Sequence, residues 1–87
     1  MIKIWAKCLV GDHIKKDMIY ETLDHYNPET LFHHITAICN ELDIPTPVIL
    51  KNHVENFDKF NHAIFLKRDF VESIDFDKLV LEHVITK

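Results

Sequence analysis

Residues 2–10 alternate with a strict period of two, and this alternation constrains the fold more than any other feature of the chain. One side of the alternation is wholly apolar and consists of Ile2, Ile4, Ala6, Cys8 and Val10. The other side consists of Lys3, Trp5, Lys7 and Leu9. Successive side chains of a β-strand point to opposite faces, so this pattern is typical of a half-buried strand. We expect a strand here with its apolar side toward the core.

The only glycine of the chain, Gly11, follows this strand directly and precedes Asp12. Glycine adopts positive φ at little steric cost, and tight hairpin turns require that conformation. A second strand is expected over residues 14–20, although Lys16 interrupts its apolar side. Its core-facing residues should be Ile14, Met18 and Tyr20. The chain is therefore predicted to open with a β-hairpin.

A first helix is predicted to begin at Asn27-Pro28-Glu29. These residues supply a capping side chain, a proline suited to the first turn, and an acid that the helix dipole favours. The helix should end near Asp43, because Pro45 disfavours helical geometry before it. Its core stripe is expected to comprise Leu31, Ile35, Ile38 and Leu42, with Phe32 and Cys39 on one flank.

A second helix is predicted over residues 47–60. Thr46-Pro47 repeats the signal of a cap followed by a proline, and Leu50, Val54 and Phe57 keep helical spacing. A strand is the alternative, because alternate residues from position 48 to position 54 also suit a strand. His53 should be a half-buried imidazole on the inner side of this helix.

The last part of the chain predicts two further strands, in the apolar runs at residues 63–66 and 79–85. The intervening residues 69–77 suit either a helical turn or an irregular loop. Five phenylalanines follow helical or strand spacing and are expected in the core: Phe57, Phe60, Phe65, Phe70 and Phe76. A chain of 87 residues supports one domain, here residues 1–87. We therefore expect an α+β fold, in which the hairpin and the C-terminal strands form a small antiparallel sheet with both helices on one face.

The charge balance argues against nucleic acid as a partner. Ten Lys and Arg stand against fourteen Asp and Glu, a formal charge of −4, whereas phosphate binding needs positive charge. Two helices followed by two strands nevertheless suggest a winged-helix-like nucleic-acid-binding protein as the alternative function. Its reading helix, residues 47–60, offers Lys51 and Lys59 beside Asn52 and Asn56, and its charges cancel.

No group of residues has the full spacing of a catalytic or cofactor site, although two mixed pairs, Glu29 with His33 and Asp58 with His62, have the i, i+4 spacing of metal ligands and leave a His/acid metalloprotein as a further alternative. Seven histidines are present, but none pairs with another at the i, i+3 or i, i+4 spacing that binds a metal on a helix, so no metal site is assigned and binding by single histidines is left open. Ser73 is the only serine and has no glycine beside it, while Cys8 and Cys39 lie in apolar stretches. One glycine cannot build a phosphate-binding loop. Neither enzymatic activity nor a cofactor is expected.

Trp5 and Leu9 lie on the side of the first strand opposite its apolar stripe, flanked by Lys3 and Lys7. Tryptophan is enriched at protein interfaces, so these four residues form the predicted contact site. We expect a non-catalytic protein that acts through protein contacts, with a homo-oligomer as the first partner to consider. Free cysteines, the absence of a signal-like N-terminus and the lack of a long apolar run predict a cytoplasmic protein that does not enter membranes.

Two stretches, residues 42–48 (LDIPTPV) and residues 69–79 (DFVESIDFDKL), resemble segments of short, uncharacterised bacterial proteins of similar length. The resemblance extends over residues 42–79. It implies a small cytoplasmic bacterial protein, and it transfers no functional residue because that family carries no established activity.

Overall fold

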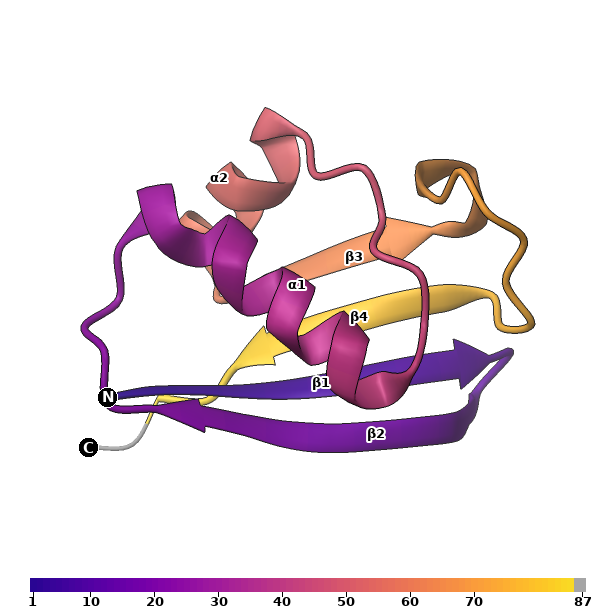
Figure 1. Cartoon of the computed structure of the whole chain (residues 1–87), viewed down its shortest axis with the longest axis horizontal. Coiled ribbons are helices and arrows are strands. Elements are labelled where there is room, and N and C mark those ends of the chain that lie inside the picture. Colours follow the sequence, from indigo (N-terminus) through magenta and orange to yellow (C-terminus); the bar gives the residue numbers. More distant parts are fainter. Residues whose placement is uncertain (86–87) are drawn as a thin grey trace.

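The computed structural model describes residues 1–85, so the last two residues of the domain expected over 1–87 lie outside the described part. The main elements are β1 (Ile2–Val10), β2 (His13–Thr22), α1 (Leu31–Leu42), α2 (Lys51–Phe60), β3 (His62–Leu66) and β4 (Lys78–His83), with 3-10 turns at Pro28–Thr30 and Lys67–Asp69. The strands form one antiparallel sheet in the order β2-β1-β4-β3. Both helices lie on the same face of this sheet (Figure 1). The expected α+β fold is confirmed.

One apolar cluster fills the space between the sheet and the helices. From the sheet it takes Ile2, Ile4, Ala6, Cys8, Ala63, Phe65, Leu79 and Leu81, and from α1 it takes Leu31, Ile35, Ile38, Cys39 and Leu42. The predicted stripes of β1 and α1 are thus confirmed, except that Val10 is exposed beside the turn. Burying one large aliphatic or aromatic side chain contributes about 1.5–3 kcal/mol, so this cluster dominates the stability of the fold.

The β1–β2 hairpin contains a β-bulge. Cys8 pairs with Lys16 and Leu9 pairs with Ile14, which leaves Lys15 as the extra residue on β2. An extra residue reverses the facing of every side chain beyond it. Ile14 therefore lies on the face away from the helices, where it is 48% exposed, and its predicted place in the core is wrong.

The helix-facing side of β2 carries Met18 and Tyr20, as predicted, together with Lys16. Lys16 reaches the end of α1, where its Nζ donates a hydrogen bond to the carbonyl oxygen of Leu42 at 2.7 Å. The last carbonyls of a helix lack partners within the helix and attract positive charge. The lysine that interrupts the apolar pattern of β2 therefore supplies a hydrogen-bond donor to the C-terminal end of α1.

The predicted boundaries of the first helix agree with the structure. The side chain of Asn27 accepts a hydrogen bond from the backbone N–H of Glu29 at 2.9 Å, and a single 3-10 turn leads into α1. Asp43 ends α1 in the left-handed conformation, with φ of 57°. Phe32 is 54% exposed, so its predicted place on the core flank is wrong; one residue along a helix turns the side chain by about 100° from Leu31.

The second helix exists but begins later than predicted, at Lys51. The residues before it are extended, because Pro47 is buried and the N–H of Val48 donates to the carbonyl oxygen of Asp69 at 2.7 Å. These long-range contacts replace the helical turn that Thr46-Pro47 indicates. Phe60 ends α2 and is 62% exposed, so its predicted place in the core is also wrong.

The segment between β3 and β4 is a 3-10 turn followed by an irregular loop. Phe70 and Phe76 anchor the loop as buried side chains in a T-shaped pair, with ring centroids 5.7 Å apart. Its acids are tied to the hairpin: Asp77 Oδ2 accepts the N–H of Gly11 at 2.6 Å, and Asp75 pairs with Lys15. The hydrogen bond from Lys15 lowers the pKa of the Asp75 carboxyl.

Among residues 1–85, no helix has both the length and the apolar character that a membrane span requires.

Candidate interaction surface

The face of the sheet opposite the helices carries a regular mixture of apolar and charged side chains. We call it the open face and define it by the outward residues of the four strands. They are Ile14, Asp17, Ile19 and Glu21 of β2; Lys3, Trp5, Lys7 and Leu9 of β1; Lys78, Val80 and Glu82 of β4; and His62, Ile64 and Leu66 of β3. All four residues of the predicted contact site lie together on this face.

Trp5 lies near the centre of the open face and is held there by polar partners. Its indole N–H donates to Oδ2 of Asp17 at 2.9 Å, and Nζ of Lys7 lies 4.0 Å from the centroid of its ring. The same ammonium is 3.9 Å from Oε1 of Glu82. These contacts fix the orientation of Trp5 before any partner binds, which reduces the entropy that binding would cost.

Four further apolar side chains of the open face are each more than one third exposed. Ile19 lies directly across from Trp5 and is 47% exposed, and Ile64 on β3 is 40% exposed. The others are Ile14 and Leu66. Exposed apolar residues interspersed with charges are a common composition of a protein contact surface.

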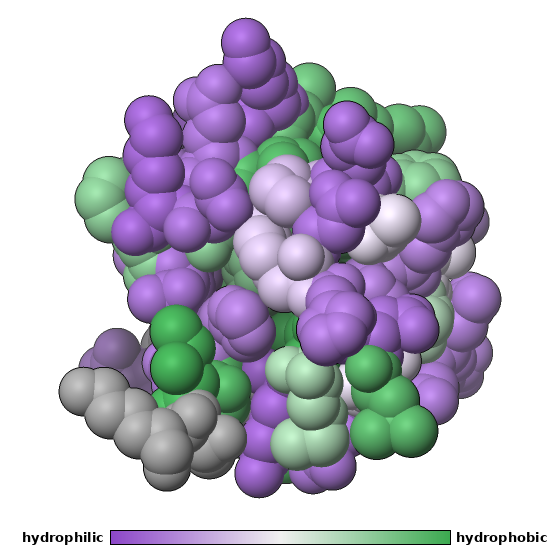
Figure 2. All heavy atoms as spheres, turned by 90° about the vertical axis from the view of Figure 1, so that its left-hand side faces the viewer, coloured by the Kyte–Doolittle hydropathy of each residue, from purple (hydrophilic) through white to green (hydrophobic). Residues whose placement is uncertain are grey.

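Charged side chains of the open face lie between its apolar ones. Lys3 pairs with Glu21 across β1 and β2 at 3.8 Å, at the end of the strands where the N-terminus lies. Seen from that end, the apolar side chains on the lower, sheet side of the molecule are separated from one another by hydrophilic ones (Figure 2). Charges placed in this way set the register of a partner.

Sequence patterning alone could not assemble this surface. The alternation of β1 identifies Trp5 and Leu9, but Ile19, Ile64 and Val80 join them only through the strand order and register. The one local signal for Ile19 is its place between Asp17 and Glu21, an apolar residue on an otherwise charged side of β2.

The two cysteines are buried in the core, as predicted. Burial raises the pKa of the Cys8 thiol and raises that of Cys39 to about 11. Nucleophilic attack needs the thiolate, which such environments disfavour. Both thiols therefore pack as small apolar groups.

His53 occupies the predicted position on the inner side of α2 and joins three segments of the chain. Its Nδ1 accepts the N–H of Leu50 at 3.0 Å, and its Nε2 lies 3.5 Å from Oδ2 of Asp69. The same carboxylate oxygen accepts the N–H of Leu66 at 2.8 Å, and the His53 ring stacks on Phe65 with centroids 4.2 Å apart. Because its Nδ1 already accepts a backbone N–H, the His53 imidazole has a structural role.

A second histidine, His83 at the end of β4, belongs to an aromatic cluster. Its ring stacks on Phe57 with centroids 5.2 Å apart and lies 5.4 Å from Tyr26. Burial lowers the pKa of His83, and burial together with the nearby Asp58 carboxylate raises the pKa of Tyr26 to about 12. Both groups are therefore neutral at pH 7.

The lowered pKa of His83 predicts a pH dependence of stability. The unfolded chain takes up the proton nearer the ordinary pKa of 6.5, so the contribution of His83 is complete above that pH and decreases as the pH falls below it. Urea unfolding at about pH 8 and about pH 5.5 should show lower stability in acid, and His83→Phe should reduce the difference. An unchanged difference in the variant would contradict this assignment.

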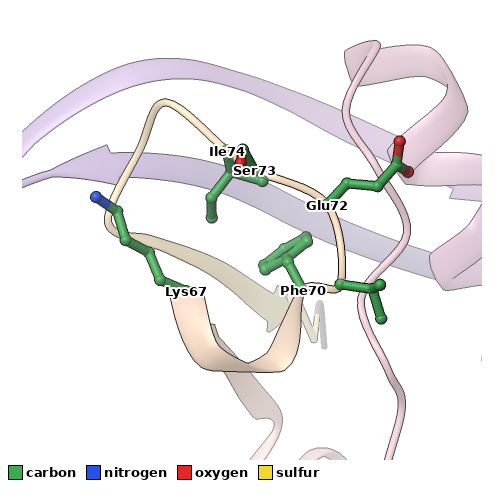
Figure 3. Close-up of a pocket in the computed structure, with 6 residues that line it drawn as sticks. Lys67, Phe70, Glu72, Ser73 and Ile74 are labelled. Atoms are coloured by element: carbon green, nitrogen blue, oxygen red, sulfur yellow. The ribbon is translucent and has the colours of Figure 1, made fainter.

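The pocket formed by the loop before β4 contains Ser73. It has a volume of about 300 Å³ and is lined by Lys67, Phe70, Val71, Glu72, Ser73 and Ile74. In Figure 3 the ammonium of Lys67 and the carboxylate of Glu72 point away from each other. Ligand sites need polar groups that converge on one point, and this pocket does not provide them.

The arrangement of α1 and α2 bears on the alternative function, nucleic-acid binding. α1 and α2 are joined by residues 43–50, a connection longer than the roughly three- or four-residue turn of a helix-turn-helix. On α2, Lys51 pairs with Glu55 at 3.8 Å. Nucleic-acid binding stays a prediction, and a gel shift at low salt is its direct test.

Within the described residues, no three His, Cys, Asp or Glu side chains gather closely enough to hold a metal ion. Comparisons with protein-family models, with curated proteins and with solved structures found no match for this chain.

Proposed function

We propose that this chain is a non-catalytic interaction protein whose contact surface is the open face. One observation carries the proposal: the only tryptophan of the chain lies in a fixed orientation on the uncovered side of the sheet, with exposed apolar side chains around it. Aromatic side chains that become buried when a partner binds supply most of the binding energy of protein interfaces.

The roles of the reactive side chains support the same proposal. Cys8 and Cys39 are packed in the core, and His53 and Asp69 hold segments of the backbone together. The open face, in contrast, contributes apolar area that the monomer does not need for its own core.

Two matched variants test the proposal. Ile19→Glu places a charge on the open face directly beside Trp5, and Phe32→Glu places one on the helix side at a residue of similar exposure. Wild type and both variants are immobilised and exposed to native cell extract, and the retained proteins are identified by mass spectrometry. Wild type and Phe32→Glu should retain the same proteins, and Ile19→Glu should lose them, because a buried unpaired charge opposes association.

Retention of the same proteins by Ile19→Glu would show that the open face is not the contact surface. Far-UV circular dichroism should be alike for all three proteins, since both substitutions affect exposed positions and cost about 1 kcal/mol or less.

A further inference from the structure

The register of β1 against β2 places residues of matching chemistry across from each other in every row of the open face. Lys3 pairs with Glu21, and Lys7 pairs with Asp17. One apolar row, Trp5 with Ile19, lies between these charged rows, and a second, Leu9 with Ile14, lies beyond the Lys7 row towards the turn. The rows therefore alternate between opposite charges and apolar pairs along the whole hairpin.

This alternation makes the hairpin complementary to a second copy of itself. A two-fold axis that runs parallel to the strands, above the seam between β1 and β2, places β1 of one copy over β2 of the other and keeps the rows in line. Lys3 of each copy then faces Glu21 of the other, and Trp5 faces Ile19. Packed sheets lie about 10 Å apart with nearly aligned strands, so side chains on facing strands meet.

The seam between β1 and β4, at the centre of the sheet, does not have this property. Across it, Trp5 pairs with Glu82 and Leu9 pairs with Lys78, so an axis over that seam would bring apolar groups against charges. Of the two seams that involve β1, the chemistry of the rows thus selects the one with β2.

The charge of the open face also favours a copy of this chain over a strongly charged partner. Lys3, Lys7 and Lys78 balance Asp17, Glu21 and Glu82 on this face, although the whole chain has a formal charge of −4. Two identical net-acidic faces would repel each other, whereas two balanced faces with opposite charges in register do not.

We infer that the open face binds a second copy of this chain through the β1–β2 hairpin, in a two-fold dimer with the two sheets face to face. This inference rests on the proposed function and names its partner. Two strands of about 30 Å at about 4.8 Å spacing give each copy a contact of roughly 300 Å² in projection, or about 600 Å² for the pair, which is below the roughly 1,200 Å² of stable specific interfaces. The dimer is therefore weak and dissociates on dilution, with a dissociation constant above about 1 µM.

Charge reversal across one row tests this geometry. In the dimer each row occurs twice, so Lys3→Glu alone puts two acids opposite acids, and Glu21→Lys alone puts two lysines opposite lysines. Each variant alone should associate about tenfold more weakly than wild type. An equal mixture should associate about as well as wild type, because every reversed acid then faces a lysine. Sedimentation equilibrium at several concentrations measures the association of wild type, of each variant and of the equal mixture.

A matched control reverses an ion pair away from the open face, with Lys51→Glu and Glu55→Lys on α2. These variants should associate like wild type, separately and mixed. Since Lys3 and Glu21 are both partly exposed, the test variants should fold, and circular dichroism checks this.

Three results would overturn the inference: wild type that stays monomeric up to about 1 mM, far above the range of specific dimers; single variants that associate like wild type; or a mixture no tighter than either variant. The proposed function has a separate outcome. If wild type is monomeric but the extract experiment still depends on Ile19, the open face is the contact surface and only the partner is different.

Discussion

Replacing Phe65 by alanine is expected to lower the free energy of unfolding by about 3–5 kcal/mol, the largest effect of any single substitution considered for this chain. Phe65 is fully buried on the helix-covered face of β3 and stacks on His53 of α2. Alanine would leave a cavity lined by side chains of the sheet and α2, and the surroundings can collapse into it only partly. Urea titration followed by circular dichroism measures the change.

The adjacent residue in the same strand provides the control. Ile64 points to the open face, so Ile64→Ala should cost about 1 kcal/mol or less in the monomer. A chain of this size has a total stability of only about 5–10 kcal/mol, and Phe65→Leu, with an expected cost of about 1–2 kcal/mol, keeps the comparison measurable if Phe65→Ala unfolds. Equal costs at positions 64 and 65 would contradict the assignment of the two faces.

Removing the His53 side chain is expected to cost about 2–4 kcal/mol. His53→Ala leaves the N–H of Leu50 without its acceptor at the start of α2 and removes the packing on Phe65. Buried donors that lose their partner cost about 1–3 kcal/mol, and the lost ring adds a cavity. The matched control is His62→Ala, which removes an exposed imidazole and should cost less than about 0.5 kcal/mol.

A double-mutant cycle with Asp69→Ala tests whether His53 and Asp69 act together. The carboxylate lies between Nε2 of His53 and the N–H of Leu66, so the two substitutions should be non-additive by about 1 kcal/mol. Additivity within about 0.3 kcal/mol would show that the two residues stabilise the fold independently.

Local patterns in the sequence predicted most of the fold, because the strand and helix periods depend only on neighbouring residues. The period of two in residues 2–10 and the single glycine after them specify the hairpin, and the Asn27-Pro28-Glu29 cap with the stripe of Leu31 and Ile35 specifies α1. Strand and helix periods depend on side-chain direction alone, so no knowledge of distant contacts is needed.

Two errors come from pairing that local patterns do not show. The bulge at Lys15 turns Ile14 away from the core, and nothing in residues 13–22 signals it. The hydrogen bond from Val48 to Asp69 holds residues before α2 in an extended form that overrides the cap at Thr46-Pro47. The error at Phe32 is local, because one residue along the helix turns its side chain away from the core stripe.

The candidate site was predictable only in part for the same reason. Alternation placed Trp5, Leu9, Lys3 and Lys7 on one side of a strand, and the structure places that side on the open face. The partners of Trp5, namely Asp17 and Ile19, come from β2 through the register, which shifts at the bulge. The pairing chemistry that selects a second copy is therefore a property of the folded hairpin.

The central claim is that the helix-covered face stabilises the fold and the open face makes contacts. Sedimentation equilibrium tests this claim most directly, by measuring the mass of wild type, Phe32→Glu and Ile19→Glu. Wild type and Phe32→Glu should form dimers reversibly as concentration rises, and Ile19→Glu should remain a folded monomer throughout. Association of Ile19→Glu equal to that of wild type, loss of association in Phe32→Glu alone, or the same mass for all three proteins would contradict the account.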